Sequence, residues 1–570
     1  MKAITARLVL GLALTFASGN IARMTAEPKP VSFEWFEYSG TNAFEVKPGP
    51  GEYQNPILAG FYPDPSICRV GQDYYMVNST FAYFPGIPIF HSRDLVNWDQ
   101  LGHVIHRPEQ LSYEGLGVSR AIFAPAISYH EGVFYVVCTM VDGIGNFVVT
   151  ATNAAGPWSD PTPLPFEGID PSIFFDDDGR AWIVNNGAPE GPPLYNGHRA
   201  IWIQEFDYRA KKMVGPRKVL VNGGVDITKK PIWIEGPHIY KVNGWYYLCC
   251  AEGGTGPGHS QVIFRSKNVD GPYTPWEKNP ILTQRTLPAN VPGAVTCTGH
   301  ADLEIGPDGN WWAVFLGVRP YQAQFSPMGR ETFLLPVNWT DDGWPVILPP
   351  QERVPLVCKA PRGVEVKPPK TLPLNGNFTW RDEFDQPTLS LAWIMLRAPK
   401  EQWWRIDAKA GKLSLVPRAE LLSGRGNPSY LGRRVQHPRF IAATEFEPPG
   451  EQGVSAGLAA FQGEQYHYYA GAKRGTNGLT IFLEQYRGKE QKIVATAVVP
   501  AAKRLRLRIV AHDANCGFDY AVDDGAWRVL ASELDAKMLT TGVAKGFVGA
   551  TVGMHARIEP APGPEQPQEK

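Results

Sequence analysis

Short apolar stretches recur in pairs along the first 350 residues of the chain, and a glycine-containing turn separates the two members of each pair. The first stretch is aliphatic and the second is rich in β-branched and aromatic residues, which is typical of a β-hairpin. Five such units occupy residues 64–77, 124–137, 170–184, 235–248 and 300–314. Their turn glycines, at positions 71, 132, 179, 244 and 309, are 61, 47, 65 and 65 residues apart.

This spacing predicts an all-β fold built from repeated sheets. A repeat of about 40 to 65 residues with several strands per unit is the sequence pattern of a β-propeller blade. Five units therefore predict a five-bladed β-propeller over residues 50–350. The alternative is an ordinary β-sandwich whose hairpins resemble one another only in composition.

The residues after the repeat predict a second domain. Residues 351–377 include a proline- and lysine-rich stretch and are expected to form an extended linker. Alternating strand patterns resume over residues 378–558 without the five-fold repeat, which predicts a β-sandwich. Residues 559–570 are polar and proline-rich, and a disordered tail is expected there.

The N-terminal residues have the order of a secretory signal. Lys2 and Arg7 precede the ten apolar residues 8–17, and small residues follow. Ten apolar residues are about half of what a membrane-spanning helix needs, so residues 1–22 predict a cleaved signal peptide, with an uncleaved anchor as the alternative. Residues 23–49 then form an N-terminal extension, and a secreted or periplasmic protein without a membrane partner is expected.

Composition excludes one large class of function. Lys and Arg number 55, Asp and Glu number 56, and the net charge is −1. With no basic run to offset this balance, the chain is not expected to bind nucleic acid by bulk electrostatics. The seven cysteines are scattered, without the spacing of a zinc site or a disulfide framework, and are expected to be buried as small hydrophobic residues.

The repeat also predicts where acidic side chains gather. Asp64, Asp170 and His300 each stand three residues before the aliphatic residue that starts their strand, and Glu235 stands four before. The innermost strands of a propeller line its central channel, so these side chains are expected to meet at one mouth. A single Asp before proline is commonly a turn residue, but a turn role gives no reason for the shifted Glu235.

Carboxyl groups that share a concave site change one another's pKa values, which proton transfer requires. Acetal cleavage needs an ionised carboxylate that activates water and a protonated carboxyl that protonates the leaving oxygen. Phe81, Phe84 and Phe123 lie near the expected strand mouths, and an aromatic pocket suits a sugar ring. The glycine-rich residues 253–258 predict a loop that places His259 beside the sugar.

At three motifs the chain resembles glycoside hydrolase family 43. They are Tyr62-Pro-Asp64-Pro-Ser-Ile67, Gly168-Ile-Asp170-Pro-Ser-Ile173 and Ile234-Glu235-Gly-Pro-His-Ile239, and further matches follow at residues 78–81, 84–86, 198–206, 299–303, 319–320 and 329–332. The resemblance implies an inverting β-xylosidase or α-L-arabinofuranosidase on a five-bladed propeller. The C-terminal half resembles the concanavalin-like jelly roll appended to the xylosidase-like branch of that family. For this domain a role in closing the pocket is favoured over a role in binding carbohydrate.

By position in these motifs, the resemblance implies that Asp64 is the general base, Glu235 the general acid and Asp170 the carboxylate that tunes and orients the acid. Arg319 is implied to hold sugar hydroxyls and to keep a neighbouring carboxylate ionised. Glu331, in the last motif, is implied as a further substrate-binding residue.

His300 matches a family histidine near the channel centre, where some members hold a calcium ion through water. A structural Ca²⁺ near His300 and a hydrogen-bonded histidine without metal both remain open. No other cofactor is expected.

One position departs from the family pattern. Xylose-releasing members often carry Trp before the Ala-Pro of the second unit, whereas this chain has Phe123, so xylose and arabinose both remain open. The leading expectation is an exo-acting glycosidase that releases xylose from the non-reducing ends of β-1,4-xylo-oligosaccharides of the plant cell wall. The alternatives are an α-L-arabinofuranosidase and a non-catalytic carbohydrate-binding propeller, and a homo-oligomer is compatible with either.

Overall fold

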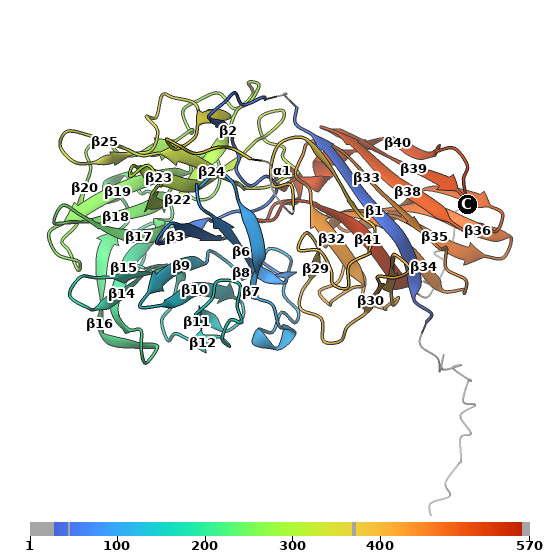
Figure 1. Ribbon diagram of the computed structural model, residues 1–570, viewed down its shortest axis with the longest axis horizontal. Helices are drawn as coiled ribbons and strands as arrows, with labels where there is room; N and C mark the ends of the chain where they lie inside the picture. The colour runs from blue at the N-terminus through green and yellow to red at the C-terminus, as the bar shows by residue number, and fades with distance from the viewer. Residues whose placement is uncertain (1–27, 44–45, 368–371, 561–570) are drawn as a thin grey trace, which may run out of the picture.

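The computed structural model describes residues 28–43, 46–367 and 372–560, which form two all-β domains lying side by side (Figure 1). In these ranges helical structure is limited to short turns at Pro108–Gln110, Ile227–Lys229 and Ala536–Leu539 and to α1 (Thr541–Ala544). None of the helices in the described ranges has the length and apolar character needed to cross a bilayer. The expected signal peptide, residues 1–22, lies outside the described residues.

The first domain is the predicted propeller. Its inner strands are β3 (Ser66–Val70), β9 (Ala126–His130), β13 (Ile169–Phe175), β17 (Glu235–Val242) and β22 (Thr296–Ile305). Strand β3 contacts β9 and β22, β13 contacts β9 and β17, and β17 contacts β22, so the inner strands form a closed ring. The five-bladed propeller predicted from the repeat is confirmed.

The remaining strands complete each blade as an antiparallel sheet. They are β4 (Asp73–Val77), β6 (Gly86–Ser92) and β7 (Asp99–Ile105) in blade 1; β8 (Ala121–Ile122), β10 (Val133–Val141), β11 (Gly145–Ala151) and β12 (Thr162–Pro163) in blade 2; β14 (Ala181–Gly187), β15 (Ala200–Asp207) and β16 (Lys212–Asn222) in blade 3; β18 (Trp245–Glu252), β19 (Ser260–Ser266), β20 (Thr274–Pro275) and β21 (Leu282–Thr283) in blade 4; and β23 (Trp311–Val318) and β24 (Glu331–Pro336) in blade 5. All five turn glycines adopt a positive φ, as the predicted hairpins require.

Hydrogen bonds join blade 5 to both of its neighbours in the ring. Asp302 on β22 accepts from the Ser66 hydroxyl of blade 1 at 2.8 Å and from the Tyr240 hydroxyl of blade 4 at 2.6 Å. The circle closes where Leu58 and Thr332 exchange backbone hydrogen bonds, which adds the segment before blade 1 to blade 5. Strands β2 (Glu52–Gln54) and β27 (Val357–Lys359) pair beside this closure, and β25 (Asn338–Trp339) pairs with β26 (Pro345–Val346).

The second domain is a sandwich of two eight-stranded sheets. One sheet contains β30 (Trp404–Asp407), β31 (Lys412–Leu415), β1 (Val31–Thr41), β33 (Arg439–Phe446), β38 (Leu505–His512), β39 (Asn515–Val522) and β40 (Arg528–Asp535), with β28 (Phe378–Asp382) beside β1. The other contains β37 (Glu490–Val499), β36 (Gly478–Arg487), β35 (Tyr466–Gly475), β34 (Val454–Gly463), β41 (Thr551–Ile558), β32 (Tyr430–Arg434), β29 (Ile394–Leu396) and β5 (Tyr83–Phe84).

Strand β1 corrects the expected N-terminal extension at residues 23–49. It lies inside the C-terminal sandwich between β31 and β33, visible as the blue strand in the orange half of Figure 1. The physical reason is its pattern of apolar residues, which buries Phe33, Phe36 and Tyr38 completely. The propeller is therefore inserted, along the chain, between the first strand of the sandwich and the rest of it.

The expected linker and tail also differ in part from the structure. Residues 351–377 contribute β27 to the closure of the propeller instead of forming only an extended connection. Glu559, assigned to the disordered tail, accepts hydrogen bonds from Ser455, Lys473 and Arg557. The rest of that tail, residues 561–570, lies outside the described residues.

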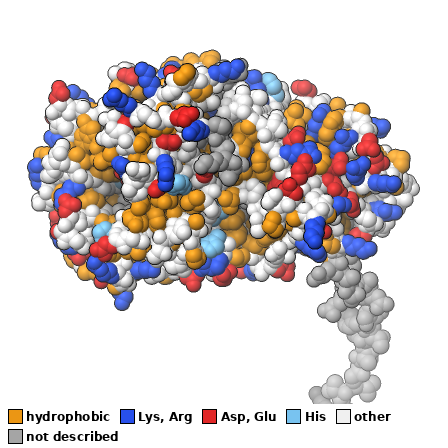
Figure 2. Space-filling model, in the orientation of Figure 1, with side chains coloured by type: hydrophobic (Ala, Val, Ile, Leu, Met, Phe, Trp, Pro, Cys, Tyr) orange, Lys and Arg blue, Asp and Glu red, His pale blue; other side chains and the backbone are white. Residues whose placement is uncertain are grey.

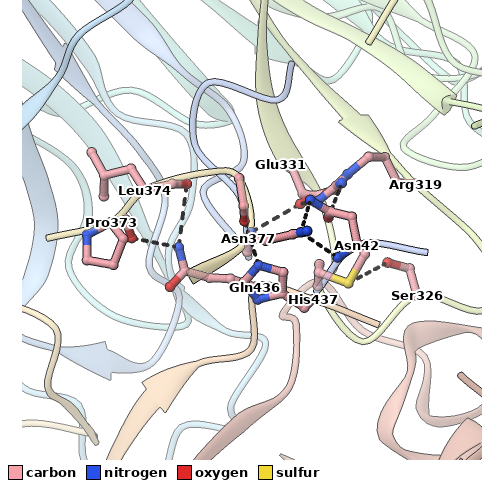
Figure 3. A network of polar contacts seen from close by, with 12 residues as sticks. Asn42, Arg319, Ser326, Glu331, Pro373, Leu374, Asn377, Gln436 and His437 are labelled. Carbon is pink, nitrogen blue, oxygen red and sulfur yellow. Dashed lines mark hydrogen bonds and ion pairs between the residues drawn. The ribbon is translucent and has the colours of Figure 1, made fainter. Parts of the chain in front are cut away.

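The two domains are joined by shared sheet, shared core and a polar network. Strand β5 from the propeller pairs with β29 at the edge of a sandwich sheet. Asn42, which follows β1, donates its backbone N–H to Asn377 and accepts from Arg319, which also pairs with Glu331 of blade 5 (Figure 3). On the face shown in Figure 2, basic and acidic side chains are intermingled, in keeping with the near-zero net charge.

Candidate active site

The side chains predicted to converge share one backbone conformation. Asp64, Asp170 and His300 have φ values of 53°, 55° and 51°, in the left-handed region that non-glycine residues rarely adopt. In blade 4 the equivalent position is Gly236, with φ 54°, and Glu235 directly precedes it. Blade 4 therefore keeps the turn but presents the carboxyl from one residue earlier, which explains the shifted offset of Glu235.

Strained backbone at equivalent places in three blades indicates a functional site. Each non-glycine residue in such a conformation costs of the order of 1–3 kcal/mol, and this strain commonly persists where function requires it. Gly236 has a second constraint, because a Cβ atom there would lie 2.9 Å from the His300 ring. The fourth blade thus needs glycine both for its φ and for the space taken by His300.

The converging residues line a cavity of about 510 Å³ at the mouth of the ring. This volume lies within the range of roughly 300–1,000 Å³ that is usual for small-ligand sites. The lining residues are Asp64, Phe81, Arg120, Phe123, Ala124, Val141, Ile169, Asp170, Arg199, Trp233, Glu235, Gly254, Thr255, His300, Arg330 and Phe547. The predicted meeting of three carboxyls and a histidine is therefore what the structure shows.

Asp64 is held as an ionised carboxylate. It is buried, and one oxygen accepts a 2.9 Å hydrogen bond from the Arg330 guanidinium while the other accepts a 2.6 Å bond from Ser79. Burial by itself raises the pKa of Asp64, but the positive charge of Arg330 and the hydrogen bond from Ser79 outweigh it, and the pKa is lowered overall. Asp64 is thus suited to accept a proton.

The surroundings of Glu235 shift its pKa in the opposite direction. Burial, together with the negative charges of Asp170 and Asp64, raises the pKa of Glu235 well above its usual range. Its Oε1 atom is buried and has no hydrogen-bond partner among the described residues. A protonated carboxyl facing a cavity without a protein partner is suited to donate its proton to a bound ligand.

Asp170, like Glu235, has a raised pKa. Burial first, and the charge of Asp64 second, raise its pKa to about 7. The backbone N–H of Gly236 donates to Asp170, so this carboxyl contacts the residue next to the acid. The protonation of Asp170 is therefore coupled to that of Glu235.

A hydrogen-bond chain positions the segment that carries Glu235. Arg199 donates from Nε and Nη2 to the Asn186 side-chain oxygen at 3.0 and 2.7 Å. Asn186 is fully buried and donates to the backbone oxygen of Ile234 at 2.6 Å. The sequence interpretation assigned no role to Arg199, although it lies in the matched motif at residues 198–206.

One wall of the cavity is aromatic and is completed by the sandwich. Phe81, Phe123 and Phe547 contact one another with ring centroids 5.5 to 5.8 Å apart. Phe547 comes from the segment before β41, and its backbone N–H donates to Ser119 of the propeller at 3.0 Å. The second domain thus supplies part of the pocket wall, and sequence reasoning had not singled out Phe547 as a site residue.

Arg319 and Glu331 do not reach the cavity, which corrects their expected roles. They form a two-point ion pair with each other, at 2.7 and 2.8 Å, on the side facing the sandwich (Figure 3). Neighbouring residues of an extended strand point to opposite faces, so Arg330 faces the pocket while Glu331 faces away. The role expected of Arg319 beside a carboxylate belongs to Arg330.

Phe84 and His259 also lie outside the cavity lining. Phe84 belongs to β5, where it is buried in the core shared by the two domains and contacts Tyr113 with ring centroids 6.3 Å apart. His259 is fully buried, with Nδ1 2.9 Å from the Cys297 carbonyl oxygen, and burial lowers its pKa to about 4. Gly254 and Thr255 of the preceding glycine-rich loop line the cavity instead.

His300 lines the cavity, and its surroundings do not supply a direct calcium site. Its Nδ1 atom is 3.9 Å from Asp64, and burial lowers the pKa of His300 to about 4, so it is neutral. Calcium prefers six to eight oxygen ligands. Among the described residues no group of three or more His, Cys, Asp and Glu side chains is placed to hold a metal ion.

The cavity of this five-bladed propeller is lined by two buried carboxyls, one with a lowered pKa and one with a raised pKa, as glycoside hydrolysis requires. Comparison with family sequence models agrees: residues 53–345 match "Glycosyl hydrolases family 43", and residues 381–562 match "Beta xylosidase C-terminal Concanavalin A-like domain". The chain belongs to glycoside hydrolase family 43. The sandwich is accordingly the concanavalin-like domain that the sequence resemblance implied.

Three similar proteins match this chain over most of its length. A "Xylosidase/arabinosidase" of Butyrivibrio fibrisolvens is 37% identical over 521 residues, covering 88% of this chain and 95% of the relative. The "Non-reducing end alpha-L-arabinofuranosidase BoGH43B" of Bacteroides ovatus is 36% identical, covering 88% and 91%. The crystal structure of a GH43_12 protein from a capybara gut metagenome superposes with a TM-score of 0.86 at 42% identity, covering 92% and 99%.

Proposed function

We propose that the protein is an exo-acting, inverting glycosidase that releases xylose from the non-reducing ends of β-1,4-xylo-oligosaccharides. The observation that carries the proposal is the contrast between two carboxyls lining one cavity. Asp64 has a lowered pKa beside Arg330, and Glu235 has a raised pKa and an unpartnered oxygen. This is the division of labour that glycoside hydrolysis requires.

In the proposed reaction, Asp64 removes a proton from a water molecule as that water attacks the anomeric carbon. Glu235 donates its proton to the glycosidic oxygen as the bond to the leaving sugar breaks. Burial raises the pKa of Glu235 most, and Asp170 raises it further when it is ionised. Asp170 also orients the acid through the backbone N–H of Gly236. His300, which is neutral, is available to hydrogen-bond to a sugar hydroxyl.

The cavity wall supports action at a chain end. Phe547 closes one side of the cavity from the sandwich, where it contacts Phe81 and Phe123. A polymer that passed through an open groove would need both ends of the site free. A walled cavity of about 510 Å³ suits the terminal residue of a short oligosaccharide instead.

A specific observation favours a second candidate, an α-L-arabinofuranosidase. Phe123 occupies the position where xylose-releasing members often carry Trp, and it contacts Phe81 and Phe547 in the cavity wall. One relative of 36% identity is named as an arabinofuranosidase, and another of 37% is named for both sugars. The size of the ring at residue 123 is therefore a candidate determinant of the sugar released.

The deciding assay pairs p-nitrophenyl β-D-xyloside with p-nitrophenyl α-L-arabinofuranoside at equal concentrations. A higher kcat/KM on the xyloside supports the first proposal, and a higher value on the arabinofuranoside supports the second. Proton NMR during the first minutes of hydrolysis reports the configuration of the first product. A product that first appears with retained configuration contradicts Asp64 as a base that acts through water.

We further propose that the protein acts outside the cytoplasm, on the basis of the signal-like order of residues 1–22. Cell fractionation with an antibody to the sandwich tests this point. Recovery of the full-length protein only in the cytoplasm would contradict it.

A further inference from the structure

Trp233 lies at the cavity two residues before the proposed acid Glu235. It lines the cavity and is 37% exposed, which is unusual for so large an aromatic side chain. Neither the motifs nor the proposed proton transfers give it a role.

The position of the Trp233 ring is fixed by several contacts. Its backbone has a φ of 52°, and its N–H donates to the Gly197 oxygen at 3.0 Å. The Arg199 guanidinium lies 4.9 Å from the ring centroid, and Arg199 is itself held by Asn186. The ring is thus preorganised, so a ligand that packs on it loses little side-chain entropy in the protein.

Exposed apolar side chains also occur in the segments next to Trp233. Ile232 is 51% exposed, and Leu194, in an adjacent loop, is 70% exposed. Tyr195 ties that loop to the Trp233 segment through a 2.9 Å hydrogen bond to the Pro231 oxygen. Exposed large apolar side chains beside a cavity mark a surface that contacts a ligand.

The chemistry of the site indicates which part of the ligand lies there. An acid must reach the oxygen that joins the two sugars, so the leaving sugar lies beside Glu235. Gly236, on one flank of Glu235, lies against the His300 ring, and His300 is 3.9 Å from Asp64. Trp233 lies on the other flank. The base Asp64 and its partner Arg330 belong to the other side of the scissile bond, because water attacks from the face opposite to the leaving group. Trp233 is therefore on the leaving-group side.

We propose that the exposed ring of Trp233 is the platform on which the leaving sugar of the oligosaccharide stacks. The C–H face of a pyranose or furanose ring packs against the aromatic face, while its hydroxyls remain hydrated. The inference rests on the proposed function and deepens it, since it makes Trp233 the residue that selects oligosaccharides over glycosides with small leaving groups.

The test compares substrates that differ only in the leaving group. Trp233→Ala is assayed with β-D-xylosyl fluoride, which has no leaving sugar, and with xylobiose and xylotriose. If the wild type prefers arabinose, the arabinofuranosyl fluoride and arabino-oligosaccharides replace these substrates. We expect kcat/KM on the oligosaccharides to fall about three- to tenfold, the factor for loss of one aromatic contact, with the fluoride unchanged within about twofold. Trp233→Phe keeps a ring and should retain most of the oligosaccharide activity.

Controls separate a platform from a merely structural role. Activity on the fluoride shows that Trp233→Ala is folded and that Glu235 is still positioned. Val214→Ala removes a comparably exposed apolar side chain, 41% against 37%, on β16 at the edge of blade 3 and outside the cavity lining. It should change activity on neither substrate by more than about twofold. Equal losses on the fluoride and the oligosaccharides, or no loss on either, would overturn the proposal. The same selective loss in Val214→Ala would overturn it as well.

A binding measurement keeps this test independent of the proposed function. Titration of xylotriose into Glu235→Ala and into the double variant Glu235→Ala/Trp233→Ala should show a three- to tenfold weaker Kd in the double variant. Equal affinities would contradict the platform, whether or not the protein proves to be a hydrolase.

Discussion

Arg330 is the cation that keeps Asp64 ionised, and its removal gives a measurable change in the pH dependence of the enzyme. Arg330 donates to Asp64 at 2.9 Å, and the side chains of both residues are less than one-tenth exposed. In Arg330→Gln the carboxylate stays buried but loses its positive neighbour. The pKa of Asp64 must then rise, and the proposed base is lost at a higher pH than in the wild type.

The size of the effect follows from the geometry of the pair. Unit charges about 4 Å apart at an effective dielectric constant of about 20 interact by about 4 kcal/mol, and one pH unit corresponds to about 1.4 kcal/mol. The hydrogen bond from Ser79 remains and reduces the change. We therefore expect the acid limb of the kcat/KM profile to move up by about one to three pH units. Arg330 also lowers the pKa of Glu235, so the alkaline limb should move in the same direction.

Thermal unfolding gives a second readout of the same pair. The lowered pKa of Asp64 contributes stability that is present above its unfolded-state pKa and is lost as the pH falls through the folded-state value. Arg330→Gln should accordingly be destabilised at neutral pH, by about 3–5 kcal/mol if the buried charge is left unpaired. The difference from the wild type should shrink as the pH is lowered.

The matched control is Arg319→Gln. Arg319 is a partly buried arginine of the same blade that also pairs with a carboxylate, Glu331, but it does not line the cavity. It should lower the melting temperature without moving either limb of the pH profile. An unchanged acid limb in Arg330→Gln, or an equal shift in Arg319→Gln, would refute the electrostatic role given to Arg330.

Three further substitutions test the remaining parts of the site. Asp170→Asn removes a negative charge that raises the pKa of Glu235, so the alkaline limb of the kcat/KM profile should move to lower pH. An unchanged alkaline limb would leave Asp170 with only a positioning role. Glu235→Ala should lose several orders of magnitude in kcat on xylobiose and much less on an aryl glycoside whose phenolate leaves unaided, so equal losses on both would contradict Glu235 as the acid. Phe547→Ala should raise KM about tenfold because the aromatic wall opens, whereas an unchanged KM would mean that the sandwich does not bound the sugar site.

The fold was largely predictable because its signal repeats. A hairpin with a glycine at positive φ recurs in every blade, and five weak signals at similar spacing support one another. Strand β1 was missed for the opposite reason. A single alternating stretch at residues 31–41 does not show which distant strands it joins, since its partners β31 and β33 lie beyond the whole propeller.

The acids were predictable for the same reason as the blades, and their partners were not. Asp64 and Asp170 hold one repeat position, which sequence spacing reveals directly. Which of two arginines in blade 5 faces the cavity depends on the side of the strand on which each lies, and the motif at residues 329–332 contains both Arg330 and Glu331. Phe547 could not be found by spacing, because it reaches the cavity from another domain.

The place of β1 in the sandwich has a consequence for synthesis on the ribosome. Trp35 and its partner Thr444 are 409 residues apart in the chain. At about 5–20 residues per second, β1 emerges and then waits roughly 20 to 80 seconds before β33 is made. During that time the entire propeller can fold, while Phe33, Phe36 and Tyr38 lack the neighbours that later bury them. Phe547 is translated later still, so a nascent chain can carry all three acids on a finished propeller and still lack the last wall of its pocket.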